Sequence, residues 1–246
     1  MKLHHFALTI GMGLAVLSGC ASTNTSNTEQ AASSASMVAK PQERVLGYFD
    51  SEGNFSRSDK SGNGYTRKLL GTTADGRSVL QDFYNSNGKA QTSPFVLFDD
   101  AGLESWDSLP FTDGDIVFFN ADGHKSSQAT LKQGTFVGNH PSYHLNGKVF
   151  LDERSDAEGN SQQSVYFDDQ GKRLFAVEFD PSGDAVTKIS VYDGAGKAHA
   201  ARDNEALTQA AAKKIAVFMH QLASREAALA GQDSPEFEDV ILPSMD

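Results

Sequence analysis

The chain has 246 residues, of which 32 are acidic and 21 are basic, and its formal net charge is -11. This acidic balance argues against nucleic acid and anionic lipid headgroups as partners, because both would repel it, and it is compatible with basic protein partners. The length allows one folded domain of about two hundred residues with a sizeable core. Cys20 is the single cysteine, so an intramolecular disulfide is excluded.

Residues 1–19 have the pattern of a secretory signal peptide. Lys2 supplies a positive charge, and an apolar run follows from Phe6 to Leu17. That run is too short to span a hydrocarbon core, but it has the length of the central region of a signal peptide. The run ends in the letters LSGC, with Cys20 as the last residue.

The LSGC sequence resembles the lipobox of bacterial lipoproteins. The resemblance implies that the signal is cut before Cys20, that Cys20 is acylated, and that several acyl chains anchor the protein stably to a membrane. The next residue is Ala21 rather than Asp. In lipoproteins with enteric-type sorting this implies the outer membrane. We expect the lipid-anchored protein to face the periplasm, with exposure at the cell surface as the alternative. The alternative is an ordinary signal peptide followed by an incidental cysteine.

Residues 20–42 are predicted to hold the lipidated cysteine and a flexible tether. From Ala21 to Gln42 the sequence is rich in Ser, Thr, Asn and Ala and has almost no large apolar side chains. Such a stretch cannot bury enough surface to offset the loss of chain entropy on folding. We therefore expect the folded part to begin at residue 43.

Residues 43–200 carry a repeat of about twelve residues. An aromatic residue stands four positions before a glycine at eight places, and the residue after the aromatic is Asp or Asn in all of them except at His144. The predicted turn positions are Phe49, Asp50 and Gly53; Tyr84, Asn85 and Gly88; Phe98, Asp99 and Gly102; Phe119, Asn120 and Gly123; Tyr143 and Gly147; Phe167, Asp168 and Gly171; Phe179, Asp180 and Gly183; and Tyr192, Asp193 and Gly196.

The repeat predicts hairpin turns joined by short strands. Asp or Asn at the first position of a type I turn can accept a backbone hydrogen bond, and Gly at the fourth can adopt the left-handed conformation that closes the hairpin. Between turns, residues such as Phe175, Val177 and Phe179 alternate with the period of a strand. We therefore predict a mainly β fold, an antiparallel meander of hairpin repeats in an open or curled sheet, plus one C-terminal α-helix.

Two families of bacterial β-repeats are similar to these units. The stretch YFDDQGKR (166–173) resembles the YD repeat of Rhs-type proteins. The stretches FYNSNGK (83–89) and YHLNGK (143–148) resemble the MORN-variant repeat. Neither resemblance implies chemistry in the repeats themselves. YD repeats build shells around other domains, and MORN-variant repeats occur in envelope proteins and in some antitoxins.

Residues 203–231 are predicted to form a helix packed on the sheet. Asp203 or Asn204 can cap its start, and Gly231 is a natural stop. The alternative is a helix that binds a groove of another protein. In the tail, residues 232–246, the apolar segment 240–242 could pack back or pair with a sheet edge. The apolar stripe of the helix consists of Leu207, Ala211, Ile215, Phe218, Leu222 and Leu229.

No catalytic, cofactor-binding or metal-binding residue is predicted. His140 and His144 could face the same side of a strand, with His124 nearby, but Pro141 interrupts the run and surface histidines are more common than a metal site. Ser142 lies between two of these histidines without a nucleophile elbow around it.

Two further features also favour structural roles. The acidic residues at 152, 156 and 158 lack the alternation of a calcium-binding loop, so turns explain them better. Trp106 is either a core residue or an exposed contact, and we expect the core.

The sequence as a whole suggests a non-enzymatic envelope lipoprotein that acts as a protein-binding or scaffold module. One alternative is a periplasmic immunity protein that neutralises a toxic effector, an idea that rests on family analogy alone. Another alternative is a structural outer-membrane lipoprotein that supports envelope integrity. The partner protein stays unidentified in each case.

Overall fold

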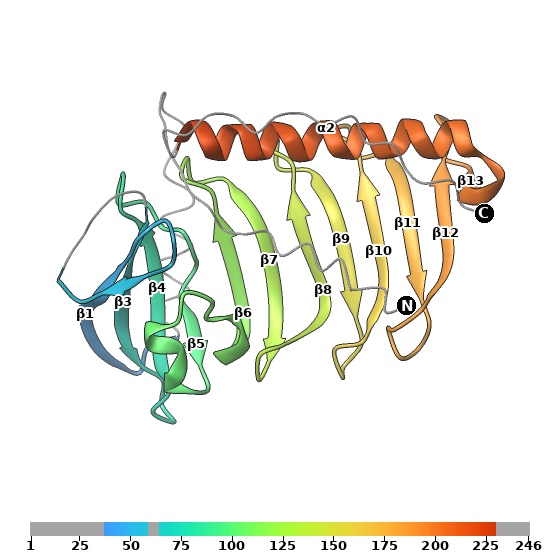
Figure 1. Cartoon of the computed structure of the whole chain (residues 1–246). Coiled ribbons are helices and arrows are strands. Elements are labelled where there is room, and N and C mark those ends of the chain that lie inside the picture. The colour runs from blue at the N-terminus through green and yellow to red at the C-terminus, as the bar shows by residue number, and fades with distance from the viewer. Residues whose placement is uncertain (1–36, 59–63, 230–246) are drawn as a thin grey trace.

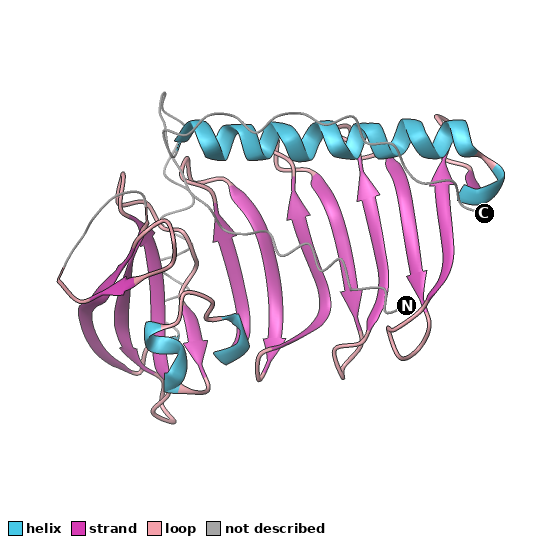
Figure 2. Cartoon of the chain, in the orientation of Figure 1, coloured by secondary structure: helices cyan, strands magenta, loops and turns pink. Residues whose placement is uncertain are grey.

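The computed structural model describes residues 37–58 and 64–229, and these form one open antiparallel sheet with a long helix laid across it (Figures 1 and 2). The predicted mainly β meander with one C-terminal helix is confirmed. The predicted signal peptide, Cys20 and the tail (232–246) lie outside the described residues, as does most of the tether. The first strand begins at Lys40, three residues before the predicted start of the folded domain.

The sheet has thirteen strands in the order β13-β12-β11-β10-β9-β8-β7-β6-β5-β4-β3-β1-β2, so almost every strand pairs with its neighbours in the chain. Their bounds are β1 Lys40–Phe49, β2 Phe55–Ser56, β3 Tyr65–Thr72, β4 Ser78–Tyr84, β5 Phe95–Leu97, β6 Thr112–Phe119, β7 Lys125–Lys132, β8 Thr135–Tyr143, β9 Val149–Ser155, β10 Ser161–Phe167, β11 Arg173–Phe179, β12 Val186–Tyr192 and β13 Ala198–Ala200.

Short 3₁₀ helices and one long α-helix accompany the sheet in residues 64–229. Two short 3₁₀ helices, η1 (Asp100–Glu104) and η2 (Leu109–Phe111), connect β5 to β6. A third, η3 (Ala201–Asp203), leads into the α-helix α2 (Glu205–Leu229), so the regular helix starts two residues later than predicted. Within the described part of the chain, no helix has the length and apolar character needed to cross a membrane.

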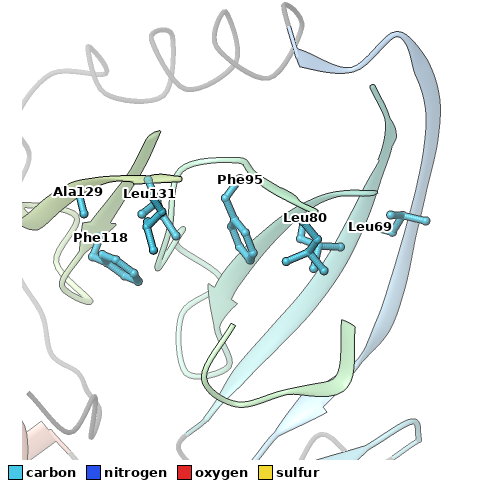
Figure 3. Packing of buried hydrophobic residues seen from close by; sticks show 8 residues of the cluster. Leu69, Leu80, Phe95, Phe118, Ala129 and Leu131 are labelled. Carbon is cyan, nitrogen blue, oxygen red and sulfur yellow. The ribbon is translucent and has the colours of Figure 1, made fainter. Parts of the chain in front are cut away.

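The first hydrophobic core lies on the sheet between β3 and β7. Leu69, Leu80 and Phe95 stand directly opposite one another on β3, β4 and β5, and their side chains point into this core (Figure 3). Residues of η1 and η2 pack against it, so the β5–β6 connection acts as its cover. The buried members are Leu69, Leu80, Phe95, Leu97, Ile116, Phe118, Ala129 and Leu131.

A buried ion pair fixes this cover to the sheet. Arg67 is fully buried, and its Nε and Nη2 donate to the two carboxylate oxygens of Asp82 at 2.9 and 2.7 Å. Its Nη1 donates to the carbonyls of Gly102 (2.9 Å) and Ser105 (2.7 Å). The guanidinium also lies 4.8 Å from the centre of the Phe49 ring. One side chain therefore joins β3, β4 and η1.

The second hydrophobic core lies between α2 and the sheet. Leu174 and Val191 are buried against Ala211 of the helix, with half-buried Leu207 and Ile215 beside them. Leu207, Ala211 and Ile215 of the stripe predicted for this helix thus face the sheet, whereas the side chain of Leu229 lies outside the described ones. The helix packs on β11 and β12 through these residues.

Farther along α2, an aromatic contact continues the packing. The Phe218 ring lies 4.3 Å from the Phe150 ring and 4.3 Å from the His144 ring, measured between centroids. The helix therefore reaches from β12 to β9, along the end of the sheet where the strands turn (Figure 1).

Pro141 does not interrupt its strand, contrary to the sequence analysis. It is buried within β8 and stands opposite Asp152 of β9. On its other side the β7–β8 register shifts between the pairs Thr130–Val137 and Ser127–Ser142, which leaves more residues on β8 than on β7. A bulge is a position in a sheet where proline, which cannot donate a ladder hydrogen bond, is tolerated.

We expect Asp82→Asn to destabilise the fold by about 3–5 kcal/mol, because it leaves the Arg67 charge buried without its counter-charge. Urea unfolding followed by Trp106 fluorescence measures the free energy. The matched control is Glu43→Gln, which removes a solvent-exposed ion pair with Lys68 and should cost less than about 1 kcal/mol. Equal effects of the two variants would contradict the assigned role of the buried pair.

We also expect Gly147→Ala to cost about 1–2 kcal/mol, because the backbone at Gly147 has φ +80° and an added Cβ meets no other atom. The cost is thus purely conformational. Gly194→Ala is the control, since Gly194 also has open space around it but no positive φ. Thermal unfolding of both variants should separate them, and a loss of stability in Gly194→Ala as large as in Gly147→Ala would refute the interpretation.

Candidate functional site

The predicted turn units gather mostly along one end of the sheet. Since successive strands are antiparallel, alternate turns fall at the same end. Gly123, Gly147 and Gly171 are spaced by 24 residues there. The units at this end begin at Phe49, Tyr84, Phe119, Tyr143, Phe167 and Tyr192, whereas those of Phe98 and Phe179 lie at the opposite end.

Side-chain oxygens of Asp close many of these turns. In one of them, Asp168 Oδ1 accepts the backbone N–H groups of Gln170 at 3.0 Å and Lys172 at 2.8 Å. Side-chain hydrogen bonds from Asn54, Asn160 and His199, with backbone N–H groups adding to them, lower the pKa of Asp50, Asp156 and Asp193 respectively. The backbone N–H of Ala185 is the main cause that lowers the pKa of Asp180. Positive φ angles between 72° and 93° occur at Gly53, Gly88, Gly123, Gly147, Gly171, Gly183 and Gly196.

The unit of Phe98, Asp99 and Gly102 departs from the hairpin form. Asp99 Oδ1 accepts from Ala101 N at 2.9 Å as the N-cap of η1, and Gly102 lies within that 3₁₀ helix. A Cβ at Gly102 would stand 2.8 Å from the Phe111 Cβ. This glycine therefore serves close packing against η2, and it does not supply the left-handed residue of a turn.

Neighbouring turns are joined by side chains that the sequence analysis did not single out. Asn146 Nδ2 donates to the Asp169 carbonyl of the next turn at 2.7 Å, while its Oδ1 accepts from Lys148 N. Asn87 makes the same pair of contacts with Ala121 and Lys89. The Asn-Gly-Lys sequence could have identified these two asparagines. Which turn each of them contacts depends on the order of the strands in the sheet.

A second set of residues forms a strip across five strands. His140, Glu153, Ser164, Val177 and Ile189 stand directly opposite one another on β8 to β12. Because residues two positions apart share a face, this strip lies on the face of Val191, which packs under α2. We call these five residues the His140–Ile189 strip.

Glu153 is electrostatically unusual within this strip. Burial, and then the nearby charge of Asp152, raises the pKa of its carboxyl group. Among the described residues, no cation lies within ion-pairing distance of this carboxylate. Burial, with the charge of Glu153 as a further cause, also raises the pKa of Tyr166. The strip therefore holds a partly desolvated carboxyl group without a compensating cation.

His140 adds an unsatisfied polar atom beside Glu153. Its Nδ1 is buried and has no hydrogen-bond partner within the described structure. Burial lowers the pKa of the ring, so the neutral form is favoured. The Phe136 ring lies 5.2 Å from it, and Phe136 is itself exposed. Native proteins leave few buried polar atoms unpaired, so this atom beside an uncompensated carboxyl group makes the strip the candidate site.

The other candidate histidines have different surroundings. His144 is buried and its Nε2 lies 3.0 Å from the carbonyl of Phe167, which accepts the hydrogen bond. His124 is exposed in the β6–β7 turn, and Ser142 stands opposite Leu151 on β9. In the described ranges, no three His, Cys, Asp or Glu side chains lie close enough to hold a metal ion.

The acidic residues and the tryptophan occupy structural positions. Asp156 accepts the backbone N–H groups of Glu158 and Asn160 in the β9–β10 turn. The carboxylate of Asp152 instead accepts hydrogen bonds from the side-chain amide of Asn139 on β8. Trp106 is half-buried, and its ring lies 4.9 Å from the Tyr65 ring and 5.8 Å from the Phe49 ring.

Comparison with known proteins yields little. No protein-family model matches the chain, and no curated protein matches it. Among solved structures, a TarM variant of S. aureus in complex with Fondaparinux, α-GlcNAc-glycerol and UDP has a TM-score of 0.26 and 14% identity, over 56% of this chain and 22% of that chain. Another TarM structure has a TM-score of 0.26 and 12% identity, over 78% and 27%. The chain spans about a quarter of these proteins, and similarity at this level carries no argument about function.

We expect Glu153→Gln to raise the melting temperature at pH 7 by a few degrees, because it removes a partly desolvated charge. A carboxyl whose pKa is raised by folding stabilises the fold fully at pH values below its unfolded pKa, near 4.5, and loses that contribution as pH rises through the folded value. The advantage of the variant should therefore vanish below about pH 4.

Calorimetry between pH 3 and pH 8 measures this effect. Glu158→Gln, the same change in an exposed turn, is the control and should leave the melting temperature nearly unchanged. A lower melting temperature for Glu153→Gln at pH 7 would show instead that the carboxylate is already compensated.

Proposed function

We propose that this chain is a membrane-anchored envelope lipoprotein that acts as a non-enzymatic protein-binding module. The lipobox-like LSGC sequence supports acylation of Cys20, and Ala21 after it supports an outer-membrane location. We propose that the anchored protein faces the periplasm. Some twenty tether residues then allow the folded body to stand away from the membrane. The acylation, the location and the tether are each inferred from the sequence.

The observation that carries the binding function is the uncompensated charge in the His140–Ile189 strip. Glu153 is a partly desolvated carboxylate, and the adjacent His140 Nδ1 lacks a partner. A Lys or Arg side chain of a partner would pair with the carboxylate and reverse the upward shift of its pKa. The net charge of -11 favours approach of a basic segment over long range.

The chemistry of the rest of the strip suits an extended peptide. Val177 and Ile189 offer apolar contact, and Ser164 can donate or accept a hydrogen bond. Exposed Phe136 adds an aromatic surface at the opposite end of the strip from Ile189. We therefore propose a partner protein that presents a basic residue within a partly apolar segment.

The experiment is immunoprecipitation of the full-length, lipidated protein from detergent-solubilised envelope of its own organism. We expect one stoichiometric partner, retained by wild type and by Glu158→Gln and reduced at least about tenfold by Glu153→Gln, since loss of one member of a desolvated charge pair costs several kcal/mol. Equal recovery by Glu153→Gln and wild type would overturn the assignment of the strip.

Two further results would redirect the proposal. A hydrolytic activity that disappears in Ser142→Ala or His140→Ala would contradict a purely binding role. If a partner is found, its identity separates the two more specific roles. A toxic effector would indicate immunity, whereas a component of an outer-membrane complex would indicate structural support.

A further inference from the structure

Two turns of the sheet carry an exposed asparagine followed by glycine. Asn87 precedes Gly88 after β4, and Asn146 precedes Gly147 between β8 and β9. The same two letters at 63–64 begin outside the described residues. An Asn-Gly bond is chemically labile, because no Cβ hinders the glycine nitrogen from reaching the carbonyl carbon of the asparagine side chain. The two turns are therefore candidate sites of covalent modification.

The modification is deamidation, and water is its only co-reactant. The Gly147 nitrogen attacks Cγ of Asn146, so that a bond forms between these two atoms and the bond from Cγ to Nδ2 breaks. Nδ2 leaves as ammonia and takes the proton that the glycine nitrogen gives up. Water then opens the resulting five-membered ring at one of its two carbonyls. The products are aspartate and isoaspartate, and nothing is oxidised or reduced.

Packing does not shield the turn between β8 and β9. Its residues 145–148 are all exposed. An added Cβ at Gly147 meets no heavy atom within 4 Å among the described residues, and the same holds at Gly88. Solvent therefore reaches the reacting atoms, so resistance to deamidation has to come from hydrogen bonds rather than from neighbouring side chains.

Three hydrogen bonds engage the reacting groups of the Asn146 turn. Gly147 N donates to the carbonyl of His144 at 2.8 Å, which occupies the attacking nitrogen. Asn146 Nδ2 donates to the carbonyl of Asp169 at 2.7 Å, and its Oδ1 accepts from Lys148 N at 3.0 Å. Rotation of the side chain toward Gly147 N breaks the last two bonds, and the attack itself breaks the first. The folded turn therefore opposes deamidation.

The Asn87 turn is held by equivalent contacts. Gly88 N donates to the carbonyl of Tyr84 at 2.9 Å. Asn87 Nδ2 donates to the carbonyl of Ala121 in the turn between β6 and β7 at 2.8 Å. Each asparagine thus uses the amide nitrogen that deamidation removes to bridge to a different neighbouring turn.

The two bridges differ in the charge beside them. At the first, Lys89 Nζ donates to the carbonyl of Asp122 at 3.0 Å, so a cation accompanies the contact that Asn87 makes. At the second, the residue that Asn146 contacts is Asp169, which carries an exposed carboxylate. A new negative charge at position 146 is therefore less well tolerated than one at position 87.

We propose that Asn146 is a deamidation site that its bridge to Asp169 keeps unreactive, and that its conversion to aspartate or isoaspartate separates the β8–β9 turn from the β10–β11 turn. These turns lie side by side at the end of the sheet next to α2 (Figure 1). Loss of Nδ2 removes the donor of the bridge, and the carboxylate left behind faces a carbonyl that can only accept. This inference goes beyond the proposed binding function and stands whether or not the His140–Ile189 strip binds a partner.

Peptide mass spectrometry of the full-length protein, incubated at mildly alkaline pH, measures the reaction, because deamidation raises the mass of the peptide. We expect Asn146 to deamidate at least about tenfold more slowly in the folded protein than in guanidinium chloride, since opening of the turn must precede attack. Asn160, which is followed by Ser161, is the reference for a more hindered bond and should react slowly in both. Equal rates at Asn146 in the two states would overturn the proposal.

A pair of glycine variants separates the bridge from global stability. Gly171 has φ +82° in the turn that Asn146 contacts, and Gly123 has φ +93° in the turn that Asn87 contacts, so alanine strains either turn. Gly171→Ala should accelerate deamidation of Asn146 but not of Asn87, and Gly123→Ala should do the reverse. Equal acceleration of both asparagines by either variant would show that overall unfolding, not the bridge, controls the reaction.

The consequence of the modification is measured on Asn146→Asp, which carries the product side chain. Hydrogen exchange of the Gly147 and Gly171 amides should become at least about threefold faster, because their turns are no longer joined. Asn87→Asp, beside Lys89, is the matched control and should affect the amides of its own two turns less. Unchanged exchange at Gly147 and Gly171 would refute the separation of the turns.

Discussion

Hydrogen bonds from backbone N–H groups to the oxygens of turn side chains set the register of this sheet. A hairpin closed by Asp168 or Asp193 has one turn geometry, and a slip of one residue would move every strand side chain to the wrong face. Because consecutive strands pair almost throughout, each turn constrains the next strand as well. The two hydrophobic cores can form only where this register places large side chains on one face.

Features that depend on local sequence could be predicted, and those that depend on register could not. The turns and the helix follow from residues close together in the chain, such as Asp168 with Gly171. The Arg67–Asp82 pair joins residues 15 positions apart, and its role depends on where the β5–β6 connection lies. Gly102 was predicted as a turn glycine because its local pattern is the same as in the hairpins, although the surrounding packing makes a 3₁₀ helix.

In the candidate site, too, local sequence predicts some residues and the sheet register determines the others. His140 was noted from its neighbours on β8, yet its partner in the sheet, Glu153, is identified only by the β8–β9 register. Glu153 has no distinguishing motif around it, and its perturbed pKa arises from burial that no sequence pattern reports. Glu153, the central residue of the proposed site, was thus absent from the sequence-based candidates. Only the folded structure identifies it.

The chain of turn-to-turn contacts has an evolutionary consequence. Each hairpin between β6 and β12 touches mainly the hairpins beside it, and the asparagine bridges at Asn87 and Asn146 repeat the same geometry. A repeat protein of this kind can gain or lose a unit without redesign of its ends. Duplication of one 24-residue hairpin would lengthen the His140–Ile189 strip by two positions with the same architecture.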